Sequence, residues 1–115
     1  MKQGELIFQG QNAFPTMTLD AAAQVGDAVA HIGAGAAGRG ADGNALLGKV
    51  LTKMHDGVGT VAIEDAGFTD IPTVGTLPLG FQLLVVDGAG KAKVGANGTR
   101  CLVNIAVDGL ANIKL

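Results

Sequence analysis

Five Asp-Gly or Asn-Gly pairs punctuate this chain, and most of them stand beside short runs rich in Val, Ile and Leu. They are Asp42-Gly43, Asp56-Gly57, Asp87-Gly88, Asn97-Gly98 and Asp108-Gly109. Such pairs supply the positive-φ residues of tight two-residue hairpin turns. The chain is therefore predicted to form a compact, mostly antiparallel β domain with little helix.

The apolar runs between these turns give the expected strands. Their spacing of about ten residues is typical of a small antiparallel β-barrel or β-sandwich. We expect strands at 16–19, 28–32, 48–55, 58–65, 68–71, 81–86, 91–94, 99–107 and 110–115. Residues 33–44, which are rich in Gly and Ala, have almost no side-chain volume to pack and are expected to form a mobile surface loop.

The length of 115 residues fits one domain. We expect an extended N-terminal arm at 1–15 and a single all-β domain at 16–115. The arm either adds a strand to the edge of a neighbour's sheet or is the first strand of its own domain. Three segments, beginning at Gly26, Gly48 and Gly80, share a loose pattern of Gly, a small or charged residue and then an apolar pair. Recurring turns into strands would produce that pattern, so no internal repeat is inferred from it.

Composition limits the classes of partner. Eight Lys and Arg against ten Asp and Glu give a net charge of −2 without a basic cluster, so no nucleic-acid partner is expected. The chain has no apolar run of the ~18 residues that a membrane span needs, and its N-terminal apolar stretch is too short for a signal peptide. We therefore expect a soluble protein, made in the cytoplasm, without a membrane partner. The 19 Gly and the absence of Trp and Tyr indicate a small aliphatic core, which favours self-association.

A glycine motif at Gly33, Gly35 and Gly38 matches the G-x-G-x-x-G fingerprint of dinucleotide-binding folds. That fingerprint works only where the glycines open a helix whose amides face a pyrophosphate. The residues that follow, from Arg39 to Asn44, contain further glycines that break helices. We therefore expect no bound cofactor.

Candidate metal-binding and catalytic residues are few. His31 and His55, with Glu64 or Asp65, have the chemistry of metal ligands, but neither His has a partner at ligand spacing. We expect no metal site. Asp27 is interpreted as a turn residue, and Glu64 and Asp65 point to opposite faces if their strand continues, so they do not form an acid/base pair. The chain has no Ser, and it is expected not to be an enzyme.

Cys101 and the phenylalanines are interpreted as structural residues. The single cysteine rules out an intramolecular disulfide and lies in an alternating segment, which favours a buried, inert thiol. Phe8, Phe14, Phe68 and Phe81 are scattered among apolar neighbours and are interpreted as core residues or interface anchors.

Five segments together resemble a known family. They are Val25–Val29 (VGDAV), Leu47–Leu51 (LGKVL), Gly57–Glu64 (GVGTVAIE), Leu79–Asp87 (LGFQLLVVD) and Gly90–Val94 (GKAKV). Their order resembles that of the capsid decoration, or cement, proteins of tailed bacteriophages, which carry a G-D-x-V turn, a G-x-V-L element and a D-x-x-G-K turn. The resemblance covers residues 16–115. The Gly/Ala segment at 33–44 is not part of the pattern, which leaves open the surface that meets a shell.

The resemblance implies a β-rich, non-catalytic virion protein that binds the outside of a phage capsid and stabilises the expanded shell. Its implied partners are the major capsid protein and copies of itself, as a trimer in preference to a dimer, and its place is the capsid surface after synthesis in the host cytoplasm. On this hypothesis, the capsid contacts are Glu5, Leu6, Ile7 and Phe8, and the oligomer interface includes Phe14, Leu79 and Phe81.

Two other classes of function remain open at this point. The first is a small β-barrel module that binds a ligand or holds an oligomeric complex together. The second is a small enzyme that uses Asp27, His31 or His55.

Overall fold

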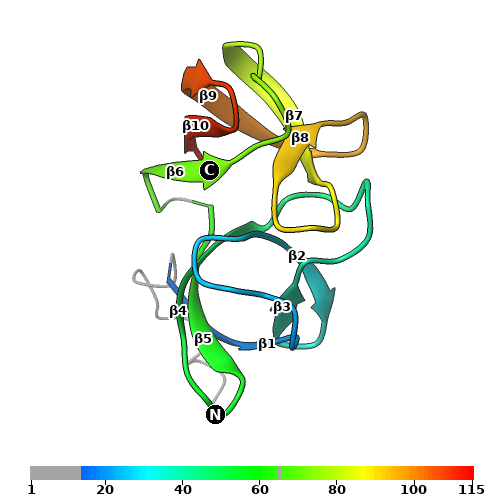
Figure 1. Ribbon diagram of the computed structural model, residues 1–115, viewed down its shortest axis with the longest axis vertical. Coiled ribbons are helices and arrows are strands. Elements are labelled where there is room, and N and C mark those ends of the chain that lie inside the picture. Colours follow the sequence, from blue (N-terminus) through cyan, green and yellow to red (C-terminus); the bar gives the residue numbers. More distant parts are fainter. Residues whose placement is uncertain (1–13, 65) are drawn as a thin grey trace, which may run out of the picture.

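The computed structural model describes residues 14–64 and 66–115, and every regular element in those residues is a β-strand (Figure 1). The predicted all-β class is thereby confirmed. The strands are β1 (Thr16–Leu19), β2 (Ala28–Gly33), β3 (Ala36–Gly38), β4 (Gly48–Lys53), β5 (Val58–Ala62), β6 (Phe68–Pro72), β7 (Gly80–Val86), β8 (Ala92–Val94), β9 (Thr99–Val107) and β10 (Leu110–Lys114). Most of the expected arm, residues 1–13, lies outside the described residues.

The first half of the described chain is a closed barrel with the strand order β1-β3-β2-β4-β5. All its pairs are antiparallel except β1–β3, which is parallel. The expectation of a mobile loop at 33–44 is wrong, because this segment contains β3, whose Ala37 is fully buried. Small side chains here let the strand lie close to its neighbours: a Cβ at Gly38 would overlap the carboxylate of Asp20.

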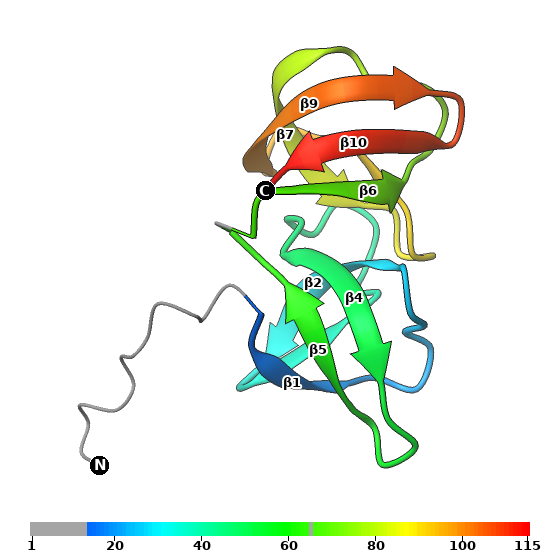
Figure 2. The same cartoon turned by 90° about the vertical axis from the view of Figure 1, so that its left-hand side faces the viewer.

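The second half is a five-stranded sheet with the order β6-β10-β9-β7-β8. Figure 2 shows this sheet above the barrel, with β9, β10 and β6 one below another. A parallel bridge between Thr73, directly after β6, and Ala92 of β8 connects the two edges of the sheet. The backbone amide of Val74 donates to the carbonyl of Ala92 over 3.0 Å at the same place.

The two halves repeat one topology. Replacing β1–β5 by β6–β10 in chain order turns the pairings of the barrel into those of the sheet, with the parallel Leu19–Ala37 pair matched by the Thr73–Ala92 bridge. The bulges match as well. In β4–β5 the register shifts between Val50 and Thr52, and in β9–β10 it shifts across Asn104, between the pairs formed by Val103 and Ile105.

The Gly-led segments mark this repetition only in part. Gly26, with φ of 93°, leads into β2, and Gly80, with φ of 90°, begins the equivalent strand β7. Gly48 begins β4, which does not correspond to β2 or β7 in the repeat. Its Gly-led segment therefore obscures the repeat period in the sequence. The closing turns Asp56-Gly57 and Asp108-Gly109 also correspond, and both glycines have positive φ. The chain is therefore built from one five-stranded arrangement used twice.

One hydrophobic core is shared between the halves. Leu46, Ala28 and Ala30 from the first half belong to the same buried cluster as Leu84 and Val86 from the second. A smaller cluster, around Val29, Val50 and Val61, fills the barrel itself. Backbone hydrogen bonds join the halves at the same place: the amide of Leu46 donates to the carbonyl of Leu84 over 3.1 Å, and that of Val86 to Asn44 over 2.8 Å.

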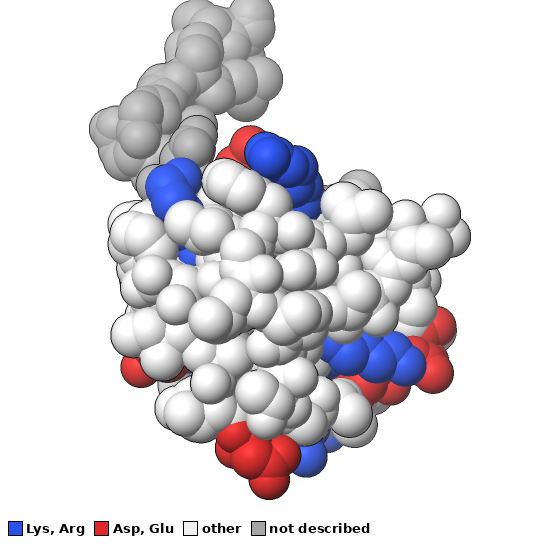
Figure 3. All heavy atoms as spheres, turned by 90° about the horizontal axis from the view of Figure 1, so that it is seen from above, with Lys and Arg blue, Asp and Glu red and all other residues white. Residues whose placement is uncertain are grey.

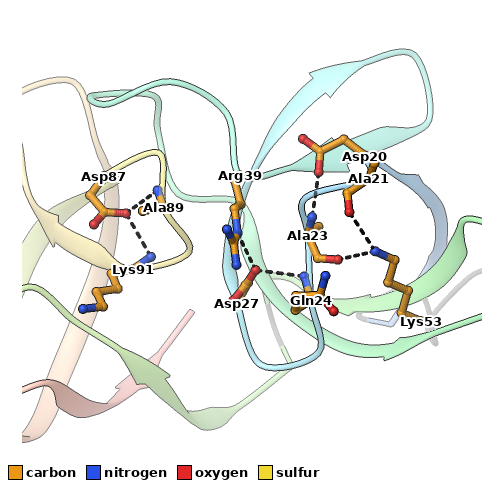
Figure 4. Close-up of polar contacts among 10 residues, drawn as sticks. All are labelled: Asp20, Ala21, Ala23, Gln24, Asp27, Arg39, Lys53, Asp87, Ala89 and Lys91. Atoms are coloured by element: carbon orange, nitrogen blue, oxygen red, sulfur yellow. Dashed lines mark hydrogen bonds and ion pairs between the residues drawn. The ribbon is translucent and has the colours of Figure 1, made fainter.

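Asp27 braces the loop between β1 and β2 against the loop after β3 (Figure 4). Its carboxylate accepts a hydrogen bond from Arg39 Nε over 2.7 Å and one from the backbone amide of Gln24 over 2.8 Å. The hydrogen bond to Asp27 is the main cause of the raised pKa of Arg39. These hydrogen bonds explain why an Asp occupies this turn, in agreement with the interpretation of Asp27 as a turn residue.

Replacing Asp27 by Asn is expected to lower the free energy of unfolding by about 1 kcal/mol, because a charge-assisted hydrogen bond in a partly buried site becomes a weaker neutral one. Urea unfolding followed by circular dichroism measures the change. The matched control is Asp42→Asn, whose ion pair with Lys93 involves a carboxylate that is 65% exposed. It should cost less than about 0.5 kcal/mol. Equal losses in both variants would contradict the assigned role.

Candidate functional site

The residues considered for metal binding and catalysis do not converge. His31 lies on β2 and His55 in the turn between β4 and β5, and both are exposed. Among the described residues, no group of three or more His, Cys, Asp or Glu side chains is placed to hold a metal ion. Asp65, a proposed partner of the histidines and of Glu64, lies outside the described residues.

The glycine motif forms a hairpin rather than a turn from a strand into a helix. Gly33 ends β2, Gly35 occupies the turn with φ of 65°, and Gly38 ends β3. A pyrophosphate site of the dinucleotide-binding kind needs the first turn of a helix after these glycines. This segment therefore does not present its amides in that arrangement.

Cys101 is buried on β9, and only 1% of its surface is exposed. Burial raises the pKa of its thiol from 9.0 to about 11, because desolvation disfavours the thiolate, and the negative charge of Glu64 adds a smaller contribution. Since the thiolate is the nucleophilic form, burial and the raised pKa both disfavour reaction at this sulfur. The prediction of a buried cysteine is confirmed.

The raised pKa makes stability depend on alkaline pH. The unfolded chain releases the thiol proton near pH 9 and the folded chain only near pH 11, so the contribution of Cys101 is complete below pH 9 and is lost as the pH rises to 11. We expect the wild type to lose up to about 2 kcal/mol more than Cys101→Ala over that interval. Urea unfolding at a series of pH values compares the two proteins. Parallel stability curves would contradict this assignment.

An open hollow of about 670 Å³ lies at the far end of the barrel, between the β1–β2 loop and the β4–β5 turn. Its polar lining includes Asp20, Lys53 and His55. Lys53 Nζ already donates to the backbone carbonyls of Ala21 and Ala23, as Figure 4 shows. These bonds hold the loop against β4, so this ammonium group has a structural task.

The residues predicted to bind a capsid, Glu5, Leu6, Ile7 and Phe8, lie outside the described residues. The three residues predicted for an oligomer interface are all exposed: Phe14 is 49%, Leu79 63% and Phe81 59% accessible. Leu79 and Phe81 lie together at the start of β7, whereas Phe14 precedes β1 in the other half. The structure therefore brings two of the three together. A core role for Phe14, Phe68 and Phe81 is wrong, since each of these residues is between 49% and 59% exposed.

A broad apolar area lies on the outward side of the second sheet, which we call the outer face. One row of side chains crosses four strands, since Phe68 pairs with Lys114, Lys114 with Leu102, and Leu102 with Phe81. A second row pairs Leu110 with Val107, and Ile105 lies between the rows. The apolar members of the outer face are Phe68, Phe81, Leu83, Leu102, Ile105, Val107 and Leu110. Figure 3 looks down on this half of the molecule, and uncharged atoms cover most of the view.

Polar groups on the outer face are few and ordered. Asn104 Nδ2 donates to Asn112 Oδ1 over 3.2 Å, and Asn112 Nδ2 donates to Asp70 Oδ1 over 3.0 Å, which forms a ladder across β9, β10 and β6. The guanidinium of Arg100 lies 3.9 Å from the centre of the Phe81 ring. This cation–π contact holds the ring in place on the surface.

Ile105 and Val107 are members of the outer face that a strict alternation places elsewhere. Alternation along 99–107 puts them on the same side as Cys101 and Val103, which are buried. The bulge at Asn104 changes the phase, because one extra residue sends all later side chains to the opposite face. Ile105 is therefore 59% exposed and Val107 54% exposed. Asn104 is a signal of this bulge in the sequence, since Asn is a common residue where regular strand pairing is interrupted.

No helix in the described part of the chain is long and apolar enough to cross a membrane. A scan against models of protein families matches none to this chain, and a search of curated proteins also gives no match.

Proposed function

We propose that this protein is a structural component of a phage virion, which binds the outer surface of the capsid and stabilises the expanded shell. The observation that carries the proposal is the outer face, a broad apolar surface on a β-sheet body that suits the self-association of such a component. An exposed apolar area of this kind is typical of protein–protein contact. The ordered family-like segments between Val25 and Val94 favour a decoration protein within that class.

The physical logic of such a protein requires contacts and no chemistry. Its partners are the major capsid protein and copies of itself. A multimer that contacts several shell subunits at once binds far more tightly than a single contact does, because each further contact is intramolecular. Binding that is selective for the expanded shell stabilises that state by mass action.

Co-sedimentation with capsid shells tests this function. The purified protein is mixed with expanded and unexpanded shells of the phage whose genome encodes it, and the pelleted amount is measured against protein concentration. We expect saturable binding to expanded shells and little to unexpanded ones. Failure to bind either form of the shell would contradict the proposal.

A truncated protein that begins at residue 14 separates the proposed attachment segment from the body. The segment contains Glu5, Leu6, Ile7 and Phe8, and every described strand lies after it. We expect this variant to keep its circular dichroism spectrum and to lose most of its shell binding. Undiminished shell binding would exclude the first 13 residues as the attachment segment and would leave the described body as the binding element.

The second candidate function is a ligand-binding module, and the hollow at the end of the barrel favours it. Native mass spectrometry of the purified protein tests this candidate, because a retained small molecule adds a fixed mass. A bound molecule that is lost in His55→Ala, which changes the lining of the hollow, would support it. A spectrum that shows only the mass of the polypeptide would count against it.

A further inference from the structure

We infer that the outer face of the second sheet is the contact surface for a second copy of this chain. The inference deepens the proposed function, since it assigns the contact between copies to this surface, and it rests on that function only for the presence of such copies. The pair forms in solution without a shell, so its failure and a failure to bind shells are distinguishable. The inference is carried by the repeated topology, by the size of the apolar surface and by the distribution of its charges.

The repetition provides an internal comparison for the outer face. The matching bulges and pairs make β4–β5 equivalent to β9–β10, so that Lys49 corresponds to Leu102 and Thr52 to Ile105. The first half thus forms the same strand arrangement with a charged side chain, Lys49, and a hydroxyl side chain, Thr52, at these two positions. Leu102 and Ile105 are not required by the fold, and their apolar character points to a partner.

The size of the outer face suits a dimer. Six of its apolar side chains, Phe68, Phe81, Leu83, Ile105, Val107 and Leu110, are each between 42% and 59% exposed. Together they expose on the order of 500 Å² of apolar surface, which lies at the upper end for the largest patch of a stable monomer. With the polar ladder and the two cations included, the face approaches the ~800 Å² that each partner contributes to a standard interface.

The polar groups make the outer face complementary to itself. It carries both signs of charge, with Arg100 and Lys114 on one hand and Asp70 on the other, so two identical faces need not repel each other. Asn104 and Asn112 each offer both donor and acceptor groups, which a twofold-related copy can match. The mixed charges of the outer face do not provide the single-sign electrostatic field that a strongly acidic or basic partner requires. These features favour a second copy as the occupant.

The experiment is light scattering coupled to gel filtration, over a series of concentrations, on the full chain. The test variant is the double substitution Leu102→Lys and Ile105→Thr, which gives the second half the residues that the first half has at the equivalent positions. Because both side chains already occur in this strand arrangement, the variant is expected to fold. The matched control is Met54→Lys, which places the same charge at another exposed apolar residue, 56% accessible, on the equivalent hairpin.

We expect the wild type to dimerise and the double variant to dissociate at concentrations about a hundredfold higher, since each copy would have to bury a lysine at the contact. Met54→Lys should dimerise like the wild type. The single variant Ile105→Thr keeps the test decisive if the double variant misfolds. It should weaken the dimer about tenfold with an unchanged circular dichroism spectrum. A wild type that is monomeric at its highest soluble concentration would overturn the inference, and so would a control that dissociates as far as the double variant.

Discussion

Replacing Gly48 by Ala is expected to lower the free energy of unfolding by at least about 3 kcal/mol, because among the described glycines a Cβ here would approach another atom most closely. Gly48 begins β4, is buried, and lies against the backbone at the end of β5. A Cβ at this position would overlap the carbonyl oxygen of Ala62 and lie 2.8 Å from its carbonyl carbon. Backbone atoms cannot move aside as a flexible side chain does, so the two strands must separate. Urea unfolding measures the loss.

Gly33→Ala is the control for this prediction. Gly33 ends β2 at the surface, has no positive φ, and a Cβ there would meet only Ala36 Cβ at 4.0 Å. The free energy of unfolding of Gly33→Ala should differ from that of the wild type by less than about 0.5 kcal/mol. A Gly48→Ala variant that is as stable as Gly33→Ala would show that β4 and β5 are not packed as closely as described.

Leu46→Ala is expected to cost about 3 kcal/mol and to weaken both halves together. Leu46 is 2% exposed and packs in the core that the halves share, against Leu84 and Val86. Its carbonyl oxygen also accepts the hydroxyl hydrogen bond of Thr99 on β9. Removing the side chain leaves a cavity between the halves rather than within one of them. Amide hydrogen exchange monitors the two halves separately and should show faster exchange in both.

Val25→Ala tests whether this loss is specific to burial. Val25 is also aliphatic but is 60% exposed in the loop before β2. Its truncation should change the stability by less than about 0.5 kcal/mol. If Leu46→Ala accelerated exchange only in the barrel, the two halves would be separate folding units and the shared core would have no energetic role.

The sequence predicted the strands well because the turns are encoded locally. Asp56-Gly57, Asp87-Gly88 and Asp108-Gly109 each lie between two strands, and all three glycines have positive φ. The expected strands at 16–19 and 99–107 have the bounds that the structure shows. Positive φ and the pairing of adjacent strands depend on neighbouring residues, which is the information that a single sequence contains.

The unpredicted features depend on contacts between distant residues. The parallel pairing of β1 with β3 joins Leu19 to Ala37, and no local pattern in the Gly/Ala segment predicts this pairing. The duplication is likewise hidden, because equivalent positions carry unlike residues, such as Lys49 and Leu102. A fold requires that inward side chains fill the core, and it leaves outward positions free to diverge.

The candidate surface was only partly predictable for a related reason. Leu79 and Phe81 are expected at an oligomer interface on the capsid-decoration hypothesis, and both prove exposed. Ile105 and Val107 could not be placed, because a bulge of one residue at Asn104 reverses their direction. Whether an apolar residue faces the core or a partner is decided by register, and register is fixed by the whole sheet.

The two proposals assign different tasks to the two halves of the repeated fold. The barrel half carries the proposed attachment segment at its N-terminal side, and the sheet half carries the outer face. On this account the protein binds a shell through one half and its own copy through the other. Duplicated topology with unlike surfaces is a direct way to obtain both contacts from one short chain.

Electron cryomicroscopy of expanded shells, prepared with and without the added protein, tests the proposed function most directly. The account predicts additional density on the outside of the shell, at symmetry-related positions, into which the barrel and the sheet fit together, with the barrel half nearer the shell. Identical maps with and without the protein, or added density confined to the inside of the shell, would contradict it.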